Sequence, residues 1–167
     1  MKYLGAAVIF LSSSLFGILA GRKGYSRLEE CRGFLLLFEY VKNQIGYFLM
    51  PTKEIYGRFE NDALYRIGFL QELRSHAEDE VYFNVWQSSF EKCRGRCALS
   101  GTECDIVMRF GGCIGKCDEH LQMKTYDLCI REMTEDISAL QTETEKNSRV
   151  YRVLGFAVGA VLAILII

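Results

Sequence analysis

The chain has 167 residues, of which 20 are Lys or Arg and 21 are Asp or Glu, so its formal net charge is only −1. This balance excludes a strongly basic nucleic-acid-binding protein. The hydrophobic content of 50% likewise excludes a disordered chain. The sequence contains one proline, which favours a mostly helical fold because proline interrupts helices.

The charged residues are confined to the middle of the sequence. All 21 acidic residues and 19 of the 20 bases lie between Gly21 and Arg152, and Lys2 is the one exception. The two ends are almost wholly apolar. This pattern predicts a cytoplasmic domain over residues 22–150, between membrane segments at residues 1–21 and 151–167.

The first apolar segment runs without a charge from Tyr3 to Gly21. As a helix it would be about 28 Å long, close to the ~30 Å thickness of the hydrocarbon layer. The alternative is a cleaved signal peptide, with Lys2 before it and Ala20-Gly21 near the cleavage site. We favour an uncleaved anchor, because bases directly after the segment, such as Arg22 and Lys23, hinder its translocation.

The second apolar segment runs from Val153 to Ile167 and would be about 22 Å long as a helix. Tyr151 at the interface and a snorkelling Arg152 would extend it towards a full span. The alternative is a buried core helix, which the lack of any polar face disfavours. Lys146, Arg149 and Arg152 precede the segment, so both ends predict a cytoplasmic middle and external termini.

The middle of the chain shows helical periodicity and no useful alternating strand pattern. The spacing predicts an amphipathic helix that ends at Met50 before Pro51, with an apolar face of Leu28, Cys31, Leu35, Phe38, Ile45 and Leu49. Shorter helices follow Thr52, the cap Asn61-Asp62, the acidic run Glu78-Asp79-Glu80 and the cap Ser100. Asp118 caps a long helix that continues into the second apolar segment. The fold class is therefore all-α, with a bundle of about six helices.

The seven cysteines raise the question of a metal site. Cys93, Cys97, Cys113 and Cys117 are spaced in pairs four apart, which places two thiols on one helix face and permits a four-thiolate zinc site. The alternative, which we favour, is that the cysteines are small core residues, since Cys31, Cys113 and Cys129 fall near apolar faces. The odd number and the cytoplasmic setting disfavour disulfides.

Other candidate motifs do not indicate catalysis. Gly111-Gly112-Cys113-Ile114-Gly115 lacks the Lys-Ser/Thr of a phosphate-binding loop, so we interpret it as a close helix crossing or a helix break. Arg94-Gly95-Arg96 is too small a basic cluster for nucleic acid. No serine or cysteine lies in a nucleophile elbow. We therefore expect neither an enzyme nor a cofactor.

Four motifs occur in a recognisable order along the chain. They are Lys2-x-Leu4-Gly5-Ala6, then Val85-Trp86-Gln87-Ser88-Ser89-Phe90, then a central motif, then Glu145-Lys146-Asn147-x-x-x-Tyr151-Arg152-x-Leu154-Gly155-Phe156-x-x-Gly159. The central motif is the most specific and contains Phe110, Gly111, Ile114, Gly115, Asp118, Gln122 and Lys124. Together these motifs resemble the stage III sporulation protein AB family of endospore-forming bacteria. The cysteine load departs from the family pattern, which does not require cysteines at 93, 97, 113 or 117.

The resemblance implies a function that composition does not reveal. Family members are mother-cell membrane proteins needed for the channel that links the mother cell to the forespore. Their cytoplasmic bundle resembles that of the F component, the platform protein of type II secretion. The implied partners are the bilayer, the other proteins of the channel operon with its secretion-type ATPase, and the forespore protein that completes the channel. The chain forming a homo-oligomer is a further alternative that the resemblance leaves undecided.

Two alternatives remain beside this interpretation. One is a generic membrane-anchored secretion platform or adaptor without a sporulation role, and the other is a cysteine-rich zinc or thiol membrane protein. For a scaffold, we expect partner contacts on exposed charged residues of the bundle. The candidates, chosen by charge and expected exposure, are Arg27, Glu30, Lys42, Arg94, Arg96 and Arg109.

Overall fold

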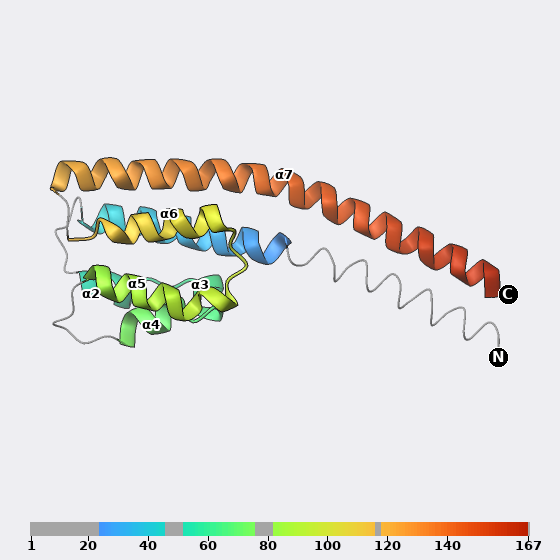
Figure 1. Cartoon of the computed structure of the whole chain (residues 1–167), viewed down its shortest axis with the longest axis horizontal. Coiled ribbons are helices and arrows are strands. Elements are labelled where there is room, and N and C mark those ends of the chain that lie inside the picture. Colours follow the sequence, from blue (N-terminus) through green and yellow to red (C-terminus); the bar gives the residue numbers. More distant parts are fainter. Residues whose placement is uncertain (1–23, 46–51, 76–81, 116–117, 167) are drawn as a thin grey trace. The chain divides into compact units, whose positions relative to one another are not determined.

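A computed structural model describes residues 24–45, 52–75, 82–115 and 118–166, and every regular element within these ranges is a helix (Figure 1). The all-α prediction is therefore confirmed. The first helix covers residues 24–45. The others are α2 (Thr52–Arg58), α3 (Asp62–Arg66), α4 (Phe69–Ser75), α5 (Tyr82–Cys93), the 3₁₀ helix η1 (Arg94–Arg96), α6 (Gly101–Gly112) and α7 (Glu119–Ile166).

The chain divides into two compact units. One is Arg27–Ser138, called here the bundle unit, and the other combines Met1–Ser26 with Ala139–Ile167. In the bundle unit, α6 and the first part of α7 lie beside helix 24–45, as ring contacts and ion pairs among them show (Figure 1). Helices α2 to α5 pack on helix 24–45 as well, through pairs such as Phe34–Phe69 and Tyr40–Phe59.

The core of the bundle unit is aromatic. Phe38 stacks on Phe110 with ring centroids 4.0 Å apart, and Trp86 meets Phe69 edge to face at 5.2 Å. All four rings are at most 1% exposed. Aromatic side chains bury more apolar area than any others, and tilted or offset pairs add further stabilisation. These contacts join helix 24–45, α4, α5 and α6 into one core.

The buried face of the first helix is broader than its spacing predicts. Leu28, Cys31 and Phe38 are buried as expected, whereas Leu35 and Ile45 are only half-buried and Leu49 lies outside the described residues. Phe34, Leu37 and Val41 are fully buried in addition. The physical reason is that this helix is covered on more than one side, so residues beside the predicted stripe also lose contact with water.

The helix predicted to start at Asn61 is interrupted. Asn61 caps α3 as expected, with its Oδ1 accepting a hydrogen bond from the Leu64 N–H at 3.1 Å. The chain then turns at Gly68, whose φ is 86°, before α4 begins at Phe69. Glycine has no Cβ and therefore adopts this left-handed conformation at little cost. One predicted helix is thus two short ones.

The beginnings of the last two helices agree with the prediction. Ser100 caps α6 through a capping box: its hydroxyl accepts from the Glu103 N–H at 3.3 Å, and Glu103 Oε2 accepts from the Ser100 N–H at 2.6 Å. Directly after Asp118, α7 runs for 48 residues into the second apolar segment. The first predicted membrane segment lies outside the described residues. Within the part of the chain that is described, no helix is both long and apolar enough to cross a membrane.

The second unit contains a close approach between two helices. A Cβ atom placed on Gly24 would lie 3.1 Å from both Cγ2 and Oγ1 of Thr144. Thr144, on α7, is buried. The start of helix 24–45 therefore packs against α7 at a point where only glycine fits without displacement.

Candidate functional site

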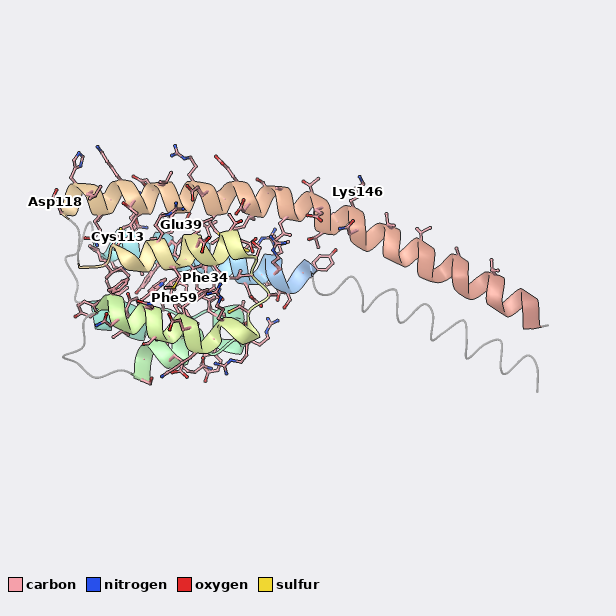
Figure 2. All side chains as sticks on the ribbon, viewed as in Figure 1. Phe34, Glu39, Phe59, Cys113, Asp118 and Lys146 are labelled. Atoms are coloured by element: carbon pink, nitrogen blue, oxygen red, sulfur yellow. The ribbon has the colours of Figure 1, made fainter. Side chains whose placement is uncertain are left out.

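The central sequence motif forms the corner between α6 and α7 (Figure 2). Phe110 is fully buried between two rings, 4.0 Å from the centroid of Phe38 and 4.3 Å from that of Tyr126. It therefore joins helix 24–45, α6 and α7 in a single stack. Cys113 at the end of α6 and Asp118 before α7 lie at the same end of the bundle unit (Figure 2).

Gly111 provides the close helix crossing that the sequence predicted. A Cβ atom at this position would lie only 2.0 Å from Cδ1 of Trp86. The indole is held in place because its Nε1–H donates a hydrogen bond of 3.0 Å to the Val107 carbonyl. The glycine thus allows α5 and α6 to approach until the tryptophan ring lies on the α6 backbone.

The remaining motif residues end α6 and start α7. Gly115 has a φ of 70°, which confirms the predicted helix break. The main-chain carbonyl of Asp118 accepts the Gln122 N–H at 2.8 Å. Buried Gln122 also donates from Nε2 to the hydroxyl of Tyr126 at 2.6 Å, and Lys124 is exposed. In the described residues, the central motif therefore specifies packing and turn geometry rather than a reactive group.

A buried charge cluster lies where helix 24–45 meets the start of α6. Arg27 donates from Nε to Glu103 Oε2 at 2.9 Å and from Nη2 to Oε1 at 2.9 Å. The Glu103 side chain is 1% exposed and that of Arg27 is 34% exposed. Burial alone would raise the pKa of Glu103, but hydrogen bonds from Arg27, Ser100 and Cys31 outweigh it and lower this pKa below its ordinary value. The carboxylate therefore stays ionised and holds the helices together.

Glu30 is buried one turn further along the first helix. Its Oε2 accepts the Ala98 N–H at 2.7 Å. Burial is the main cause of a raised pKa at Glu30, and the hydrogen bond from Ala98 only partly opposes it. This carboxyl therefore fastens the connection between α5 and α6 to the first helix.

The structure divides the six expected contact residues into three groups. The expected exposure of Glu30 is wrong, because its side chain turns inwards to accept the Ala98 N–H. Three others form ion pairs within the bundle unit: Arg27 with Glu103, Lys42 with Asp127 at 2.5 Å, and Arg109 with Glu132. Arg94 and Arg96 are exposed. Whether any of them contacts a partner stays a prediction.

The cysteines do not form a metal centre among the described residues, where no cluster of three or more potential ligands occurs. Cys31 and Cys129 are buried as predicted, Cys113 is half-buried, and Cys117 lies outside the described residues. Cys93 is buried, and half-buried Cys97 donates from its thiol to the Cys93 carbonyl at 3.3 Å. Burial raises the pKa of Cys97 to about 12 and also raises that of Cys93, so both thiols are protonated at neutral pH.

A depression of about 230 Å³ is lined by Glu60, Asn61, Asp62, Tyr65, Leu70 and Arg74. Two of its polar side chains, Asn61 and Arg74, already serve the fold. Asn61 caps α3, and Arg74 donates to the carbonyls of Tyr56 and Phe59 at 3.1 and 2.5 Å. The lining contains no nucleophile paired with a base, which general acid–base or covalent catalysis would need.

Sequence reasoning missed the Arg27–Glu103 pair. The Ser100-x-x-Glu103 spacing indicates a capping box, and this signal was available in the sequence. It does not reveal that the same glutamate also binds an arginine 76 positions away. Such a pairing depends on how the helices pack together.

The described residues define an all-helical bundle whose motif and charge clusters serve packing, capping and turn formation. A family model described as stage III sporulation protein AB matches residues 2–167, and the chain belongs to this family. The resemblance drawn from the four motifs is therefore confirmed. Membership implies a role in sporulation, and the family is not a known enzyme family.

A solved structure titled stage III sporulation protein AB has the same fold. It matches with a TM-score of 0.59 and 16% sequence identity, over 72% of this chain and 97% of that chain. At this identity the match shows the fold alone. A search of curated proteins found no match.

Proposed function

We propose that this chain is a structural, non-enzymatic membrane component of the channel between mother cell and forespore. In this role it acts as a scaffold similar to a type II secretion platform protein. The observation that carries the proposal is the family match over residues 2–167, which includes both apolar ends. The proposed location is the mother-cell membrane that faces the forespore, with the bundle unit in the cytoplasm.

The course of α7 supports anchorage at the C-terminal end. This helix is unbroken from Glu119 to Ile166, so it includes both core residues such as Tyr126 and the apolar stretch after Arg152. Lys146, Arg149 and Arg152 lie just before that stretch. Bases beside a membrane segment favour the cytoplasmic side, which agrees with a cytoplasmic bundle unit.

The chemistry of the bundle unit supports a scaffold rather than a catalyst. Buried thiols with raised pKa values, such as Cys93, are poor nucleophiles and poor ligands. Ion pairs such as Arg27–Glu103 are used within the fold. The proposed partners are other proteins of the channel operon, including the secretion-type ATPase, and the lipid bilayer.

Site-specific thiol labelling tests the topology. Gly57→Cys introduces an exposed thiol, because no heavy atom lies within 4 Å of a Cβ at Gly57. In intact cells, a membrane-impermeant maleimide should leave Gly57→Cys unmodified and should modify a cysteine appended after Ile167. Lysis should expose both sites. Labelling of Gly57→Cys in intact cells would contradict the proposal. Peptide mass spectrometry distinguishes a label on this cysteine from a label on a native cysteine.

Genetic complementation tests the role. Deleting the gene should block spore formation, and the full chain should restore it, whereas a chain that ends before residue 151 should not. A variant with alanine at Cys93, Cys97, Cys113 and Cys117 should also restore spore formation. One stoichiometric zinc in the purified chain would instead favour a zinc protein. Expression in vegetative cells but not in sporulating mother cells would favour a generic adaptor.

A further inference from the structure

The connection between α5 and α6 contains two exposed arginines, Arg94 and Arg96. We call residues Arg94 to Ser100 the basic loop. From Lys92 to Thr102 the sequence has three bases and no acidic residue. Lys92 pairs with Glu72 at 2.8 Å, but the structure gives neither Arg94 nor Arg96 a carboxylate partner among the described residues.

The composition and exposure of the basic loop suit an interface between water and lipid. Arg94, Gly95 and Arg96 are exposed, while Ala98 and Leu99 are half-buried. The Arg96 guanidinium lies back on the bundle unit near Gly68 and donates to Cys93 Sγ at 3.5 Å. Arg94 lies within electrostatic reach of Cys104, and its guanidinium makes no hydrogen bond or ion pair within the described part of the chain. The loop thus presents two cations beside a partly exposed leucine.

The basic loop lies at the end of the bundle unit where the chain enters and leaves it. The Ala98 N–H is bonded to Glu30, and Glu103 is bonded to Arg27, the first residue of the unit. Asp136, two residues before the last residue of the unit, lies within electrostatic reach of both Arg27 and Glu103. Figure 1 shows the α5–α6 connection at the end of the unit where helix 24–45 begins.

Both apolar segments therefore connect to the end of the bundle unit that bears the basic loop. Arg27 is only six positions after Gly21, where the first apolar segment ends. Even a fully extended chain would span at most about 21 Å over this distance. The cytoplasmic leaflet is negatively charged. Each base that comes within about one Debye length of its surface strengthens membrane binding about fivefold.

We propose that the basic loop is a contact site for anionic lipid headgroups of the membrane that anchors the chain, with Arg94 and Arg96 as the binding cations. This inference rests on the proposed function, since it requires membrane anchorage. An acidic protein surface is electrostatically similar. The membrane is favoured because both chain connections leave the bundle unit at this end.

Hydrogen exchange of the full chain in lipid nanodiscs tests the proposal. One nanodisc contains phosphatidylcholine alone, and the other contains phosphatidylcholine with phosphatidylglycerol. Amides of the basic loop should exchange on the order of tenfold more slowly in the anionic discs, and high salt should remove the difference. The double variant R94Q/R96Q should exchange equally in both discs. Arg131→Gln is the matched control, because Arg131 is also exposed and should leave the lipid dependence intact.

Each other result has a distinct meaning. Equal exchange in both discs by a chain that has inserted overturns the inference but leaves the proposed function standing. Equal slowing by inorganic phosphate in neutral discs, or slowing that requires an acidic protein, also overturns the lipid assignment. A chain that inserts into neither kind of nanodisc contradicts the proposed function itself.

Discussion

Trp86 of α5 lies directly against the backbone of Gly111 in α6, so closely that a Cβ atom on the glycine would overlap the indole ring. The same indole donates its N–H to the Val107 carbonyl, one turn earlier on α6. A hydrogen bond and a steric constraint therefore fix the α5–α6 crossing together. The crossing in turn sets where Phe110 meets Phe38 and Tyr126.

Gly111→Ala should reduce the free energy of unfolding by about 3 kcal/mol, because the added methyl group displaces a buried ring in a close-packed core. Gly112→Ala is a matched control, since its Cβ would meet only Phe83 Cε2 at 3.7 Å. It should change stability by less than about 1 kcal/mol. Fluorescence of Trp86, the one tryptophan, reports unfolding in urea. Equal effects of the two substitutions would contradict this account.

Glu103→Gln should reduce the free energy of unfolding by about 2 kcal/mol, because a neutral amide replaces the buried carboxylate that binds the Arg27 guanidinium. The Arg66–Glu29 pair provides the comparison, with side chains 60% and 54% exposed. Glu29→Gln should cost less than about 0.5 kcal/mol, as is usual for surface pairs. The measurement is urea unfolding at pH 7. A Glu29→Gln effect as large as that of Glu103→Gln would show that burial does not decide the outcome.

Glu30→Gln should increase the free energy of unfolding at pH 7, because it removes a charge that is unfavourable when buried. The amide oxygen of glutamine can still accept the Ala98 N–H. Burial raises the pKa of Glu30 in the folded state, so the ionised form opposes folding above that pKa. The advantage of the variant should shrink as pH falls through the raised pKa and the wild-type carboxyl takes up its proton.

The neighbouring Glu103 should show the opposite dependence on pH. Its pKa is lowered in the folded state, so its contribution to stability is present above the unfolded value of about 4.5 and is lost as pH falls through the folded value. Unfolding free energies of wild type, Glu30→Gln and Glu103→Gln between pH 4 and pH 7 measure both effects. A loss of stability in Glu30→Gln at pH 7 would refute the first prediction.

Gly24→Val should destabilise the contact between helix 24–45 and α7 by about 1–2 kcal/mol, because its side chain would collide with Thr144. Thr144→Ala removes Cγ2 and Oγ1, so it should restore part of the stability in the double variant. Thermal unfolding followed by circular dichroism measures this coupling. Gly57→Val is the control, since that position is open. Strict additivity of the two substitutions would mean that the residues do not interact.

Helix boundaries set by neighbouring residues were predictable. Asn61 and Ser100 cap helices through side-chain hydrogen bonds to main-chain groups three residues away, and such interactions depend only on local sequence. The break at Gly68 was not predicted. The apolar periodicity continues through it, and a glycine within a helical pattern does not by itself disclose a positive φ.

The sequence alone determined the helical class, the family and the role of the glycine-rich segment, because periodicity, caps and a four-part motif order are properties of the linear chain. Tertiary structure alone decided that Glu30 is buried, that Arg27 binds Glu103, and that Arg94 and Arg96 are exposed and form no ion pair with any described residue. The physical reason is that the solvation of a charged side chain depends on which distant helix covers it. Residues 27 and 103 are far apart in the chain and become neighbours only when the bundle packs.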